Sequence, residues 1–324
     1  MPDDGGSLEE RLLNGDRRAL ARLLTNVENG TERGRAAIGA LYSHTGHAHT
    51  IGVTGSSGAG KSTVVGALAL EYRQRGSTVG IIAVDPSSPF TDGAILGDRV
   101  RMQALSSDPD IFIRSLATRG ALGGLSAGVA DVVLLLDAFG KEIVLIETVG
   151  AGQDEVEIAG TAQTTVLVNT PGMGDDIQTM KAGIMEIADV LAVNKADLPG
   201  ADILISQLQA LLSLSTDKSW APPIVRMIAT ERSGIADLAD ACDAHRDFLA
   251  QSGRLADDER DRVRRRILEL TRNRLLAELL QHAGGEDRLE TLVAAVVDRT
   301  LDPHAAADRW LRRTDPSHDP PESS

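Results

Sequence analysis

The chain has 324 residues, 42% of them apolar and 25% charged, which is the composition of a soluble globular protein with one large α/β domain and a smaller appendage. Its formal net charge of −14 argues against a nucleic-acid partner held by a broad basic surface. No apolar run approaches the length of a membrane span, no secretory signal opens the chain, and one cysteine allows no intrachain disulfide, so we expect a cytoplasmic protein with no membrane partner.

The first part of the chain, residues 7–44, predicts a helical segment. Leucines recur at roughly helical spacing, and Asn14-Gly15-Asp16 has the residues of a helix break followed by a new cap. The leucines that carry the pattern are Leu8, Leu12, Leu13, Leu20, Leu23 and Leu24.

Between residues 49 and 250, short apolar runs alternate with helical stretches. The predicted strands are His49–Thr54, Val79–Val84, Ile111–Arg114, Ile143–Glu147, Thr165–Asn169, Val190–Asn194 and Ile224–Ala229. Most are continuous apolar runs, as expected of strands covered on both faces. The predicted fold class is therefore α/β, a doubly wound and mostly parallel sheet whose ligands bind at the carboxyl ends of the strands.

Beyond residue 253 the strand pattern disappears. Residues 257–283 and 288–312 predict two helical stretches separated by Gly284-Gly285, with a wide leucine stripe. We keep two interpretations of the stripe, packing onto the domain's own surface and a two-fold dimer interface. The predicted division is an N-terminal helical segment at 1–48, a nucleotide-binding domain at 49–252, a helical extension at 253–313 and a disordered tail at 314–324. Cys242, in a predicted helix, is interpreted as an inert structural thiol rather than a nucleophile.

A glycine-rich run, Gly-Ser-Ser-Gly-Ala-Gly-Lys-Ser, follows the first predicted strand and precedes a helix. It matches the phosphate-loop pattern, in which glycines let backbone N–H groups face phosphate oxygens. Lys61 is the candidate that reaches the β- and γ-phosphates, and the Ser62 hydroxyl is the candidate Mg²⁺ ligand. The predicted phosphate-binding set is Gly55, Ser56, Ser57, Gly58, Ala59, Gly60, Lys61, Ser62 and Thr63. The chain therefore binds a nucleoside triphosphate.

The tetrapeptide Asn194-Lys195-Ala196-Asp197 follows a predicted strand and has the pattern of a guanine-recognition motif. The Asp197 carboxylate can accept hydrogen bonds from N1–H and the exocyclic amine of guanine, a donor pair that adenine lacks. The Lys195 stem can lie over the base, and Asn194 can brace the loop. A surface turn is the alternative, but the upstream phosphate loop favours GTP over ATP.

Several carboxylates follow predicted strands. Glu147 is a candidate for the magnesium and switch network, with a capping role as the alternative. Asp85, before a stiff Pro-Ser-Ser-Pro turn, and Asp98 are candidates of the same kind, with a helix cap or surface charge as the alternative. Gln153 is a candidate for orienting water. The predicted catalytic residues are Lys61, Asp98, Glu147 and Gln153, and the predicted metal ligands are Ser62, Asp85, Asp98 and Glu147.

From about residue 8 to 312 the chain resembles the methylmalonyl-CoA mutase-associated GTPases of the MeaB/ArgK type. The most diagnostic runs are Asp-Pro-Ser-Ser-Pro at 85–89, Leu-Gly-Asp-Arg at 96–99 and Glu-Thr-Val-Gly-Ala-Gly-Gln at 147–153. Further matches are Phe112–Arg114, Pro171–Gln178 and Lys181–Glu186. The resemblance implies a homodimeric GTPase that uses GTP, GDP and Mg²⁺ and acts as chaperone of an adenosylcobalamin-dependent acyl-CoA mutase. It also implies a switch at Thr170–Lys181.

The chain departs from the family pattern after its last strand. The base-contacting loop there usually carries Ser-Ala, and this chain has Ala229-Thr230, which remain the candidate base contacts. Two other functions stay open. A nickel-delivery GTPase would need metal ligands, for which His44, His47 and His49 are candidates, although they also read as ordinary polar residues before the first strand. A kinase acting on a transport protein would need an acceptor site that no motif indicates.

Overall fold

The computed structural model describes residues 6–85, 105, 107–117, 124–148, 160–172, 187–213, 219–281 and 285–311. Its sheet has seven strands in the order β3-β2-β4-β1-β5-β6-β7, and every neighbouring pair is parallel. The strands are β1 His49–Thr54, β2 Val79–Asp85, β3 Ile111–Ala117, β4 Ile143–Glu147, β5 Thr164–Asn169, β6 Val190–Val193 and β7 Ile224–Arg226. The predicted fold class is confirmed.

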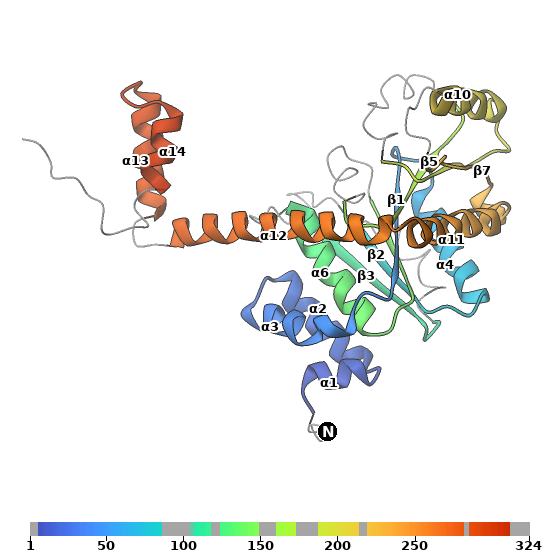
Figure 1. Cartoon of the computed structure of the whole chain (residues 1–324), viewed down its shortest axis with the longest axis horizontal. Helices are drawn as coiled ribbons and strands as arrows, with labels where there is room; N and C mark the ends of the chain where they lie inside the picture. Colours follow the sequence, from blue (N-terminus) through green and yellow to red (C-terminus); the bar gives the residue numbers. More distant parts are fainter. Residues whose placement is uncertain are drawn as a thin grey trace, which may run out of the picture. The chain divides into compact units, whose positions relative to one another are not determined.

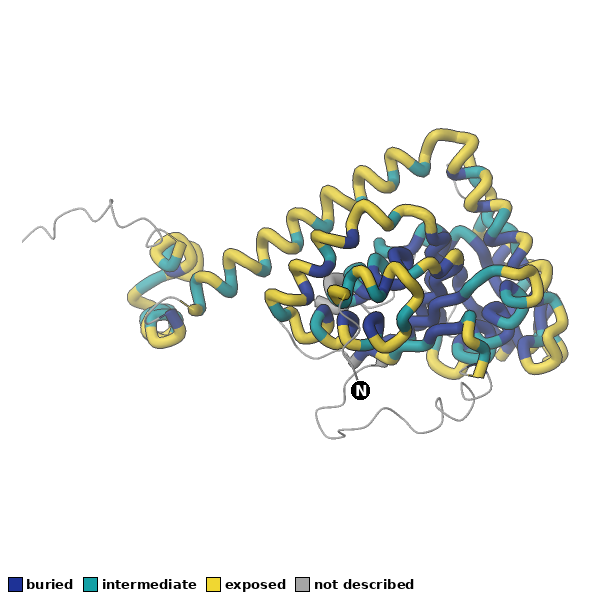
Figure 2. The backbone as a smooth tube through the Cα atoms, turned by 90° about the horizontal axis from the view of Figure 1, so that it is seen from below, coloured by how far each residue is buried: buried dark blue, intermediate teal, exposed yellow. Residues whose placement is uncertain are grey.

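Helices cover both faces of this sheet (Figure 1). Strands β1, β4, β5 and β6 are buried along their whole length, because their apolar residues alternate between two cores. One core joins the sheet to α4 (Lys61–Gln74) and α11 (Ile235–Ser252). The opposite face packs against α6 (Gly124–Ala138) and the N-terminal helices, and against α10 (Ala201–Ser213) further along. Figure 2 shows this buried interior enclosed by exposed helix faces.

The N-terminal segment forms three helices, α1 Leu8–Leu13, α2 Arg17–Glu28 and α3 Glu32–Leu41, followed by the short turn η1 (Tyr42–His44). The predicted break is present, because the Asp16 carboxylate accepts hydrogen bonds from the N–H groups of Arg18 and Ala19 as the N-cap of α2. All the leucines of the pattern except Leu8 and Leu13 are fully buried against the sheet and α6. The segment is thus part of the core that supports the sheet.

Two predicted elements at the carboxyl end differ from the structure. The last strand stops at Arg226, not Ala229, because Ala229 opens the 3-10 turn η2 (Ala229–Glu231) and Ile228 pairs with Ser233. The helical stretch predicted over 288–312 contains two helices, α13 (Gly285–Val297) and α14 (Pro303–Leu311). The Asp302 carboxylate caps α14 through the N–H groups of His304 and Ala305, so a new helix begins there.

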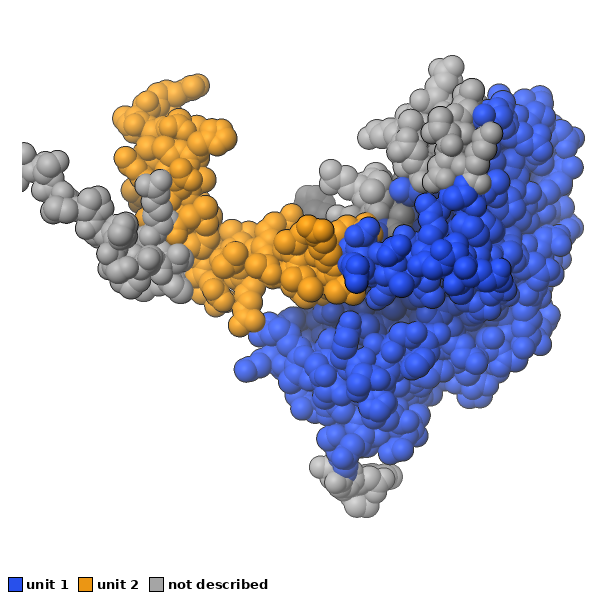
Figure 3. Space-filling view, viewed as in Figure 1, with its two compact units in different colours: residues 1–262 blue, residues 263–324 orange. Residues whose placement is uncertain are grey.

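The chain divides into two compact units, residues 1–262 and 263–324 (Figure 3). Helix α12 (Arg254–Gln281) begins in the first unit and has no buried residue. Several side chains of its leucine stripe are exposed, namely Leu268, Leu270 and Leu275. In the second unit, the Arg288 guanidinium donates to the Arg309 carbonyl and ties α13 to α14. The predicted domain limits remain a prediction. No helix of the described residues is long and apolar enough to cross a membrane.

A chain of four polar side chains lies at the amino ends of β1, β5 and β6, of which three are buried and the fourth, Asp189, is 29% exposed. His49 Nε2 is 2.9 Å from the Thr164 hydroxyl, which is 3.0 Å from Nδ1 of His245 on α11. Nε2 of His245 is 3.3 Å from the Asp189 carboxylate, and Trp220 packs on the His245 ring. Burial lowers the pKa of His49 to about 3 and of His245 to about 4, and raises the pKa of Asp189 to about 7. We call these four residues, His49, Thr164, Asp189 and His245, the amino-edge chain.

Candidate functional site

The predicted phosphate loop connects the end of β1 to the start of α4. Its three glycines adopt positive φ angles, +140° at Gly55, +78° at Gly58 and +89° at Gly60. A Cβ atom on Gly55 would stand 2.2 Å from the Val168 carbonyl oxygen, and one on Gly60 would stand 2.6 Å from Nδ2 of Asn194. Only glycine fits at these two positions, so the loop's shape follows directly from the glycine spacing in the sequence.

Lys61 places a positive charge inside this loop. It is the first residue of α4, its side chain is buried, and its ammonium donates hydrogen bonds to the carbonyls of Gly55 (2.7 Å) and Ser56 (3.0 Å). The N-terminus of α4 faces the same loop and adds a positive partial charge. A phosphate group is the anion that such a combination of ammonium and helix N-terminus binds.

The next residue, Ser62, reaches the end of β4. Its hydroxyl donates a hydrogen bond to Oε1 of Glu147, a buried carboxylate. Hydroxyl and carboxylate oxygens are the ligand types that Mg²⁺ accepts, usually from one or two protein groups together with substrate phosphates. The donor set of Ser62 and Glu147 therefore fits Mg²⁺.

Asn194 links the phosphate loop to the segment that follows β7. Its amide nitrogen donates to the Ala59 carbonyl (2.9 Å), and its amide oxygen accepts the N–H of Ala229 (3.1 Å). The side chain is 3% exposed, so both bonds are shielded from water. Lys195, with a φ of +55°, extends its ammonium to the Gly58 carbonyl (2.9 Å). The bracing role expected of Asn194 thus has a structural counterpart.

The remaining predicted base contacts gather at the same edge of the sheet. Asp197 is exposed after β6, and the neighbouring Ala196 N–H donates to the Met227 carbonyl (3.1 Å). Ala229 and Thr230 follow in η2. Segments that are about 30 residues apart in the sequence therefore meet, as a guanine site requires, and their contact with a base remains a prediction.

Other predicted residues fall outside what the structure describes. Asp98 and Gln153 lie in segments that are not described, and only the backbone of Asp85, at the end of β2, is described. Of the predicted switch at Thr170–Lys181, the described part is 170–172. Their roles remain predictions.

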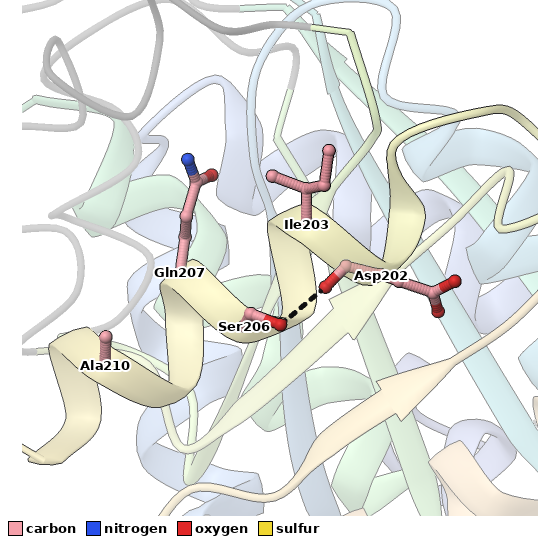
Figure 4. Close-up of a pocket in the computed structure, with 5 residues that line it drawn as sticks. All are labelled: Asp202, Ile203, Ser206, Gln207 and Ala210. Atoms are coloured by element: carbon pink, nitrogen blue, oxygen red, sulfur yellow. Dashed lines mark hydrogen bonds between the residues drawn. The ribbon is translucent and has the colours of Figure 1, made fainter.

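The sequence analysis did not predict two further candidate residues of the site. Thr54, the last residue of β1, and Thr148, just after β4, place their hydroxyl oxygens 3.3 Å apart, and both side chains are fully buried. The sequence did contain a signal for them, since each is a polar β-branched residue at or just after the end of a predicted strand. A surface pocket along α10 lies elsewhere, lined by Asp202, Ile203, Ser206, Gln207 and Ala210 (Figure 4). None of these belongs to the predicted site.

The histidines considered for nickel have different surroundings. His49 is buried in β1 and bonded to Thr164, while the backbone N–H of His47 donates to the Asp137 carboxylate. His44 and His47 line a surface pocket that also contains Lys141. Within the described parts of the chain, no group of three or more His, Cys, Asp or Glu residues is arranged to hold a metal ion.

A parallel sheet, a glycine-rich loop after β1 and a helix starting at its lysine define a P-loop nucleoside triphosphatase. The sequence profile described as Methylmalonyl Co-A mutase-associated GTPase MeaB matches residues 20–284. The chain belongs to this MeaB family and is a P-loop GTPase.

Individual proteins agree with this assignment. A protein of Pyrococcus abyssi, named only as a candidate GTPase, is 47% identical over 94% of this chain and 95% of its own length. The mitochondrial methylmalonic aciduria type A homolog of Caenorhabditis elegans is 29% identical over 94% of this chain and 82% of its own length. The crystal structure of a LAO/AO transport system kinase superposes with a TM-score of 0.73 at 25% identity, covering 97% of this chain and 99% of that one.

Proposed function

We propose that this GTPase is the chaperone of an adenosylcobalamin-dependent acyl-CoA mutase, and that GTP binding and hydrolysis gate loading of the cofactor and protect or reactivate the mutase. The observation that carries this proposal is the extent of the family match, which covers residues 20–284. That range includes most of the N-terminal helix α2 and all of α3 as well as the phosphate loop, whereas a generic P-loop core would match only the latter. The name of the worm relative, a methylmalonic aciduria type A homolog, supports the same partner class.

In the proposed reaction, water attacks the γ-phosphate in line with the departing GDP. The Lys61 ammonium and the loop N–H groups face the charge that develops on the phosphate oxygens. Ser62 and Glu147 would hold Mg²⁺, which when bound neutralises charge on the β- and γ-phosphates. Gln153 is our candidate for orienting the water, with Asp85 and Asp98 in the metal and switch network. We expect slow turnover by the isolated protein, accelerated by the mutase.

Guanine selectivity is assigned to the segments after β6 and β7. Asp197 would accept the two guanine donors, and the Lys195 stem, held across the loop by the bond to Gly58, would cover the base. The Asn194 side chain, bonded to both Ala59 and Ala229, would keep phosphate and base sites in register. GTP and GDP are therefore the proposed nucleotides.

We also propose that a second copy covers the leucine stripe of α12. Four apolar side chains of this helix are about half exposed or more, Ile267 at 58%, Leu268 at 62%, Leu270 at 47% and Leu275 at 54%. Apolar side chains in such density on one element favour an interface. Leu275→Glu should convert a dimer to a monomer in light scattering, whereas Ile203→Glu, at the 66% exposed Ile203 of α10, should not. A wild-type monomer at micromolar concentration would contradict this part of the proposal.

The mutase proposal is tested by recovering the partner from the native cell with the full chain as bait. We expect an acyl-CoA mutase in the bound fraction, in amounts that differ between GDP and a non-hydrolysable GTP analogue. The purified mutase should then accelerate GTP hydrolysis, and Lys61→Ala should abolish that hydrolysis. Fast hydrolysis by the isolated protein, unaffected by the mutase, would overturn the proposal. Transfer of the γ-phosphate to a protein or amino acid would replace it with the kinase alternative.

A further inference from the structure

Thr54 and Thr148, which the sequence analysis did not single out, support an inference about how the site is held together. Thr54 Oγ1 and Thr148 Oγ1 are 3.3 Å apart, and both side chains have no exposed surface. The Thr148 N–H also donates to the Val53 carbonyl (3.2 Å), so the end of β4 is attached to the end of β1 by a backbone and a side-chain bond. Within the described residues, each hydroxyl has the other as its partner.

Packing alone does not require these hydroxyl groups. Valine has nearly the same shape as threonine, and a pair of valines would fill the same buried space without any polar atom to satisfy. Apolar residues precede the pair in both strands, Val53 before Thr54 and Ile146 before Glu147. Unlike the contact between two valines, a hydrogen bond has a preferred distance and angle, so the threonine pair holds its two oxygen atoms at a set separation.

The pair closes a ring of contacts around the phosphate loop. Thr54 is bonded covalently to Gly55, whose carbonyl accepts from the Lys61 ammonium, and Lys61 is followed by Ser62. The Ser62 hydroxyl donates to Glu147, which is followed by Thr148, and Thr148 returns to Thr54. Removing the threonine hydroxyls takes away the side-chain bond between the ends of β4 and β1, so that the backbone bond from the Thr148 N–H to the Val53 carbonyl holds this end of β4 alone while the other contacts of the ring remain possible.

We propose that Thr54 and Thr148 are a positioning pair for GTP hydrolysis, which holds the Glu147 carboxylate at the distance from Ser62 that the hydrolytic site needs. The pair touches no substrate atom and acts through Glu147. The inference therefore rests on the role proposed above for Glu147 in the metal and switch network.

The test separates stability from positioning by comparing single and double valine variants. Thr54→Val or Thr148→Val leaves one buried hydroxyl without a partner, so each should lower the urea midpoint of the full-length protein. The double variant removes both hydroxyls and should recover most of that stability. If the pair positions Glu147, the double variant still hydrolyses GTP about 10- to 100-fold more slowly, with KM for GTP little changed. Its half-maximal Mg²⁺ concentration should also rise. Thr148→Ser, which keeps the hydroxyl, should retain the wild-type rate.

Two controls make each outcome decisive. Thr164→Val removes a buried hydroxyl of the amino-edge chain and should lower the urea midpoint without changing the hydrolysis rate. Glu147→Gln tests the carboxylate itself and should slow hydrolysis at least as much as the double variant. Recovery of both stability and rate in the double variant would overturn the positioning role. A wild-type rate in Glu147→Gln would overturn the role of Glu147, and with it the proposal, whatever the threonines do.

Discussion

The two edges of one sheet carry polar groups that are arranged in opposite ways. At the carboxyl edge, Lys61 and Lys195 donate to backbone carbonyls of the phosphate loop. At the amino edge, the polar groups of the amino-edge chain bond mainly to one another and are covered by Trp220. The comparison teaches that strands β1, β5 and β6 lead at one edge to groups that surround the phosphate loop and at the other to groups that bond to one another, with only Nδ1 of His49 left without a partner among the side-chain atoms of the amino-edge chain.

The two edges also differ in the charge of their side chains. The carboxyl edge holds ammonium groups beside a helix N-terminus, which is favourable for an anionic ligand. Burial keeps both histidines of the amino edge neutral by lowering their pKa values to about 3 and 4. We therefore expect nucleotide-dependent effects from one edge and pH-dependent effects from the other.

The largest expected effect comes from replacing one buried lysine at each edge by alanine and comparing the two variants. Lys61 and Lys141 are both buried and both donate to backbone carbonyls, Lys141 to that of Asp110 (2.7 Å). Lys61→Ala should lower GTP hydrolysis at least about 100-fold, because it removes the charge that faces the phosphate. Lys141→Ala should lower the melting temperature and leave the rate per folded molecule unchanged. Equal losses of rate in the two variants would remove the distinction between the edges.

A smaller effect is expected from the base-recognition carboxylate. Asp197→Asn should weaken the preference for GTP over ATP about 10- to 100-fold, since a carboxylate that accepts two hydrogen bonds is replaced by an amide. Equilibrium binding of both nucleotides measures the ratio. Asp202→Asn is the matched control, because Asp202 is an exposed carboxylate on α10 that pairs with Arg226. An unchanged ratio in Asp197→Asn would refute the assignment of guanine recognition to this residue.

The smallest expected effect is on stability against pH, and it comes from the amino edge. The histidines titrate near pH 6.5 when unfolded but only near pH 3 and 4 when folded, so the unfolded chain binds more protons as pH falls. Each histidine should therefore remove about 2 kcal/mol of stability between pH 7 and 5. Protonation of Asp189 changes stability in the opposite direction. Its pKa in the folded state is raised to about 7, so the folded state gains this proton first and is stabilised as the pH falls.

The contribution of Asp189 is thus at most about 2 kcal/mol of stabilisation over the same pH range, reduced by the 29% exposure of its side chain. Asp189→Asn removes this offset and should make the loss of stability on acidification steeper than in the wild type. Urea midpoints of both proteins between pH 5 and 7.5 measure how stability changes with pH. Glu290→Gln, on α13 of the second unit, is the control. A slope no steeper than wild type in Asp189→Asn would contradict the amino-edge interpretation.

Local sequence patterns were sufficient for most of the elements. Seven largely apolar runs became seven strands, because strands covered on both faces consist mainly of apolar residues. Several boundaries were wrong: β3 runs to Ala117 rather than Arg114, and two differences near the carboxyl end have physical reasons in the structure. The last predicted strand was extended through Ala229, but the Ala229 N–H bonds to the Asn194 side chain and cannot continue the strand ladder. The second C-terminal helix began at an Asp302-Pro303 start signal that the prediction overlooked.

The sequence by itself determined the phosphate loop, the guanine motif and the order of strands and helices, because glycine spacing and apolar runs act on neighbouring residues. Only the tertiary structure decided which distant groups meet. Ser62 and Glu147 are 85 residues apart, Asn194 and Ala59 are 135 apart, and His49 and Thr164 are 115 apart. These contacts depend on the strand order β4-β1-β5-β6, which places strands distant in the chain side by side. No local pattern encodes that order, so the ring through Thr54 and Thr148 and the amino-edge chain emerged only with the fold.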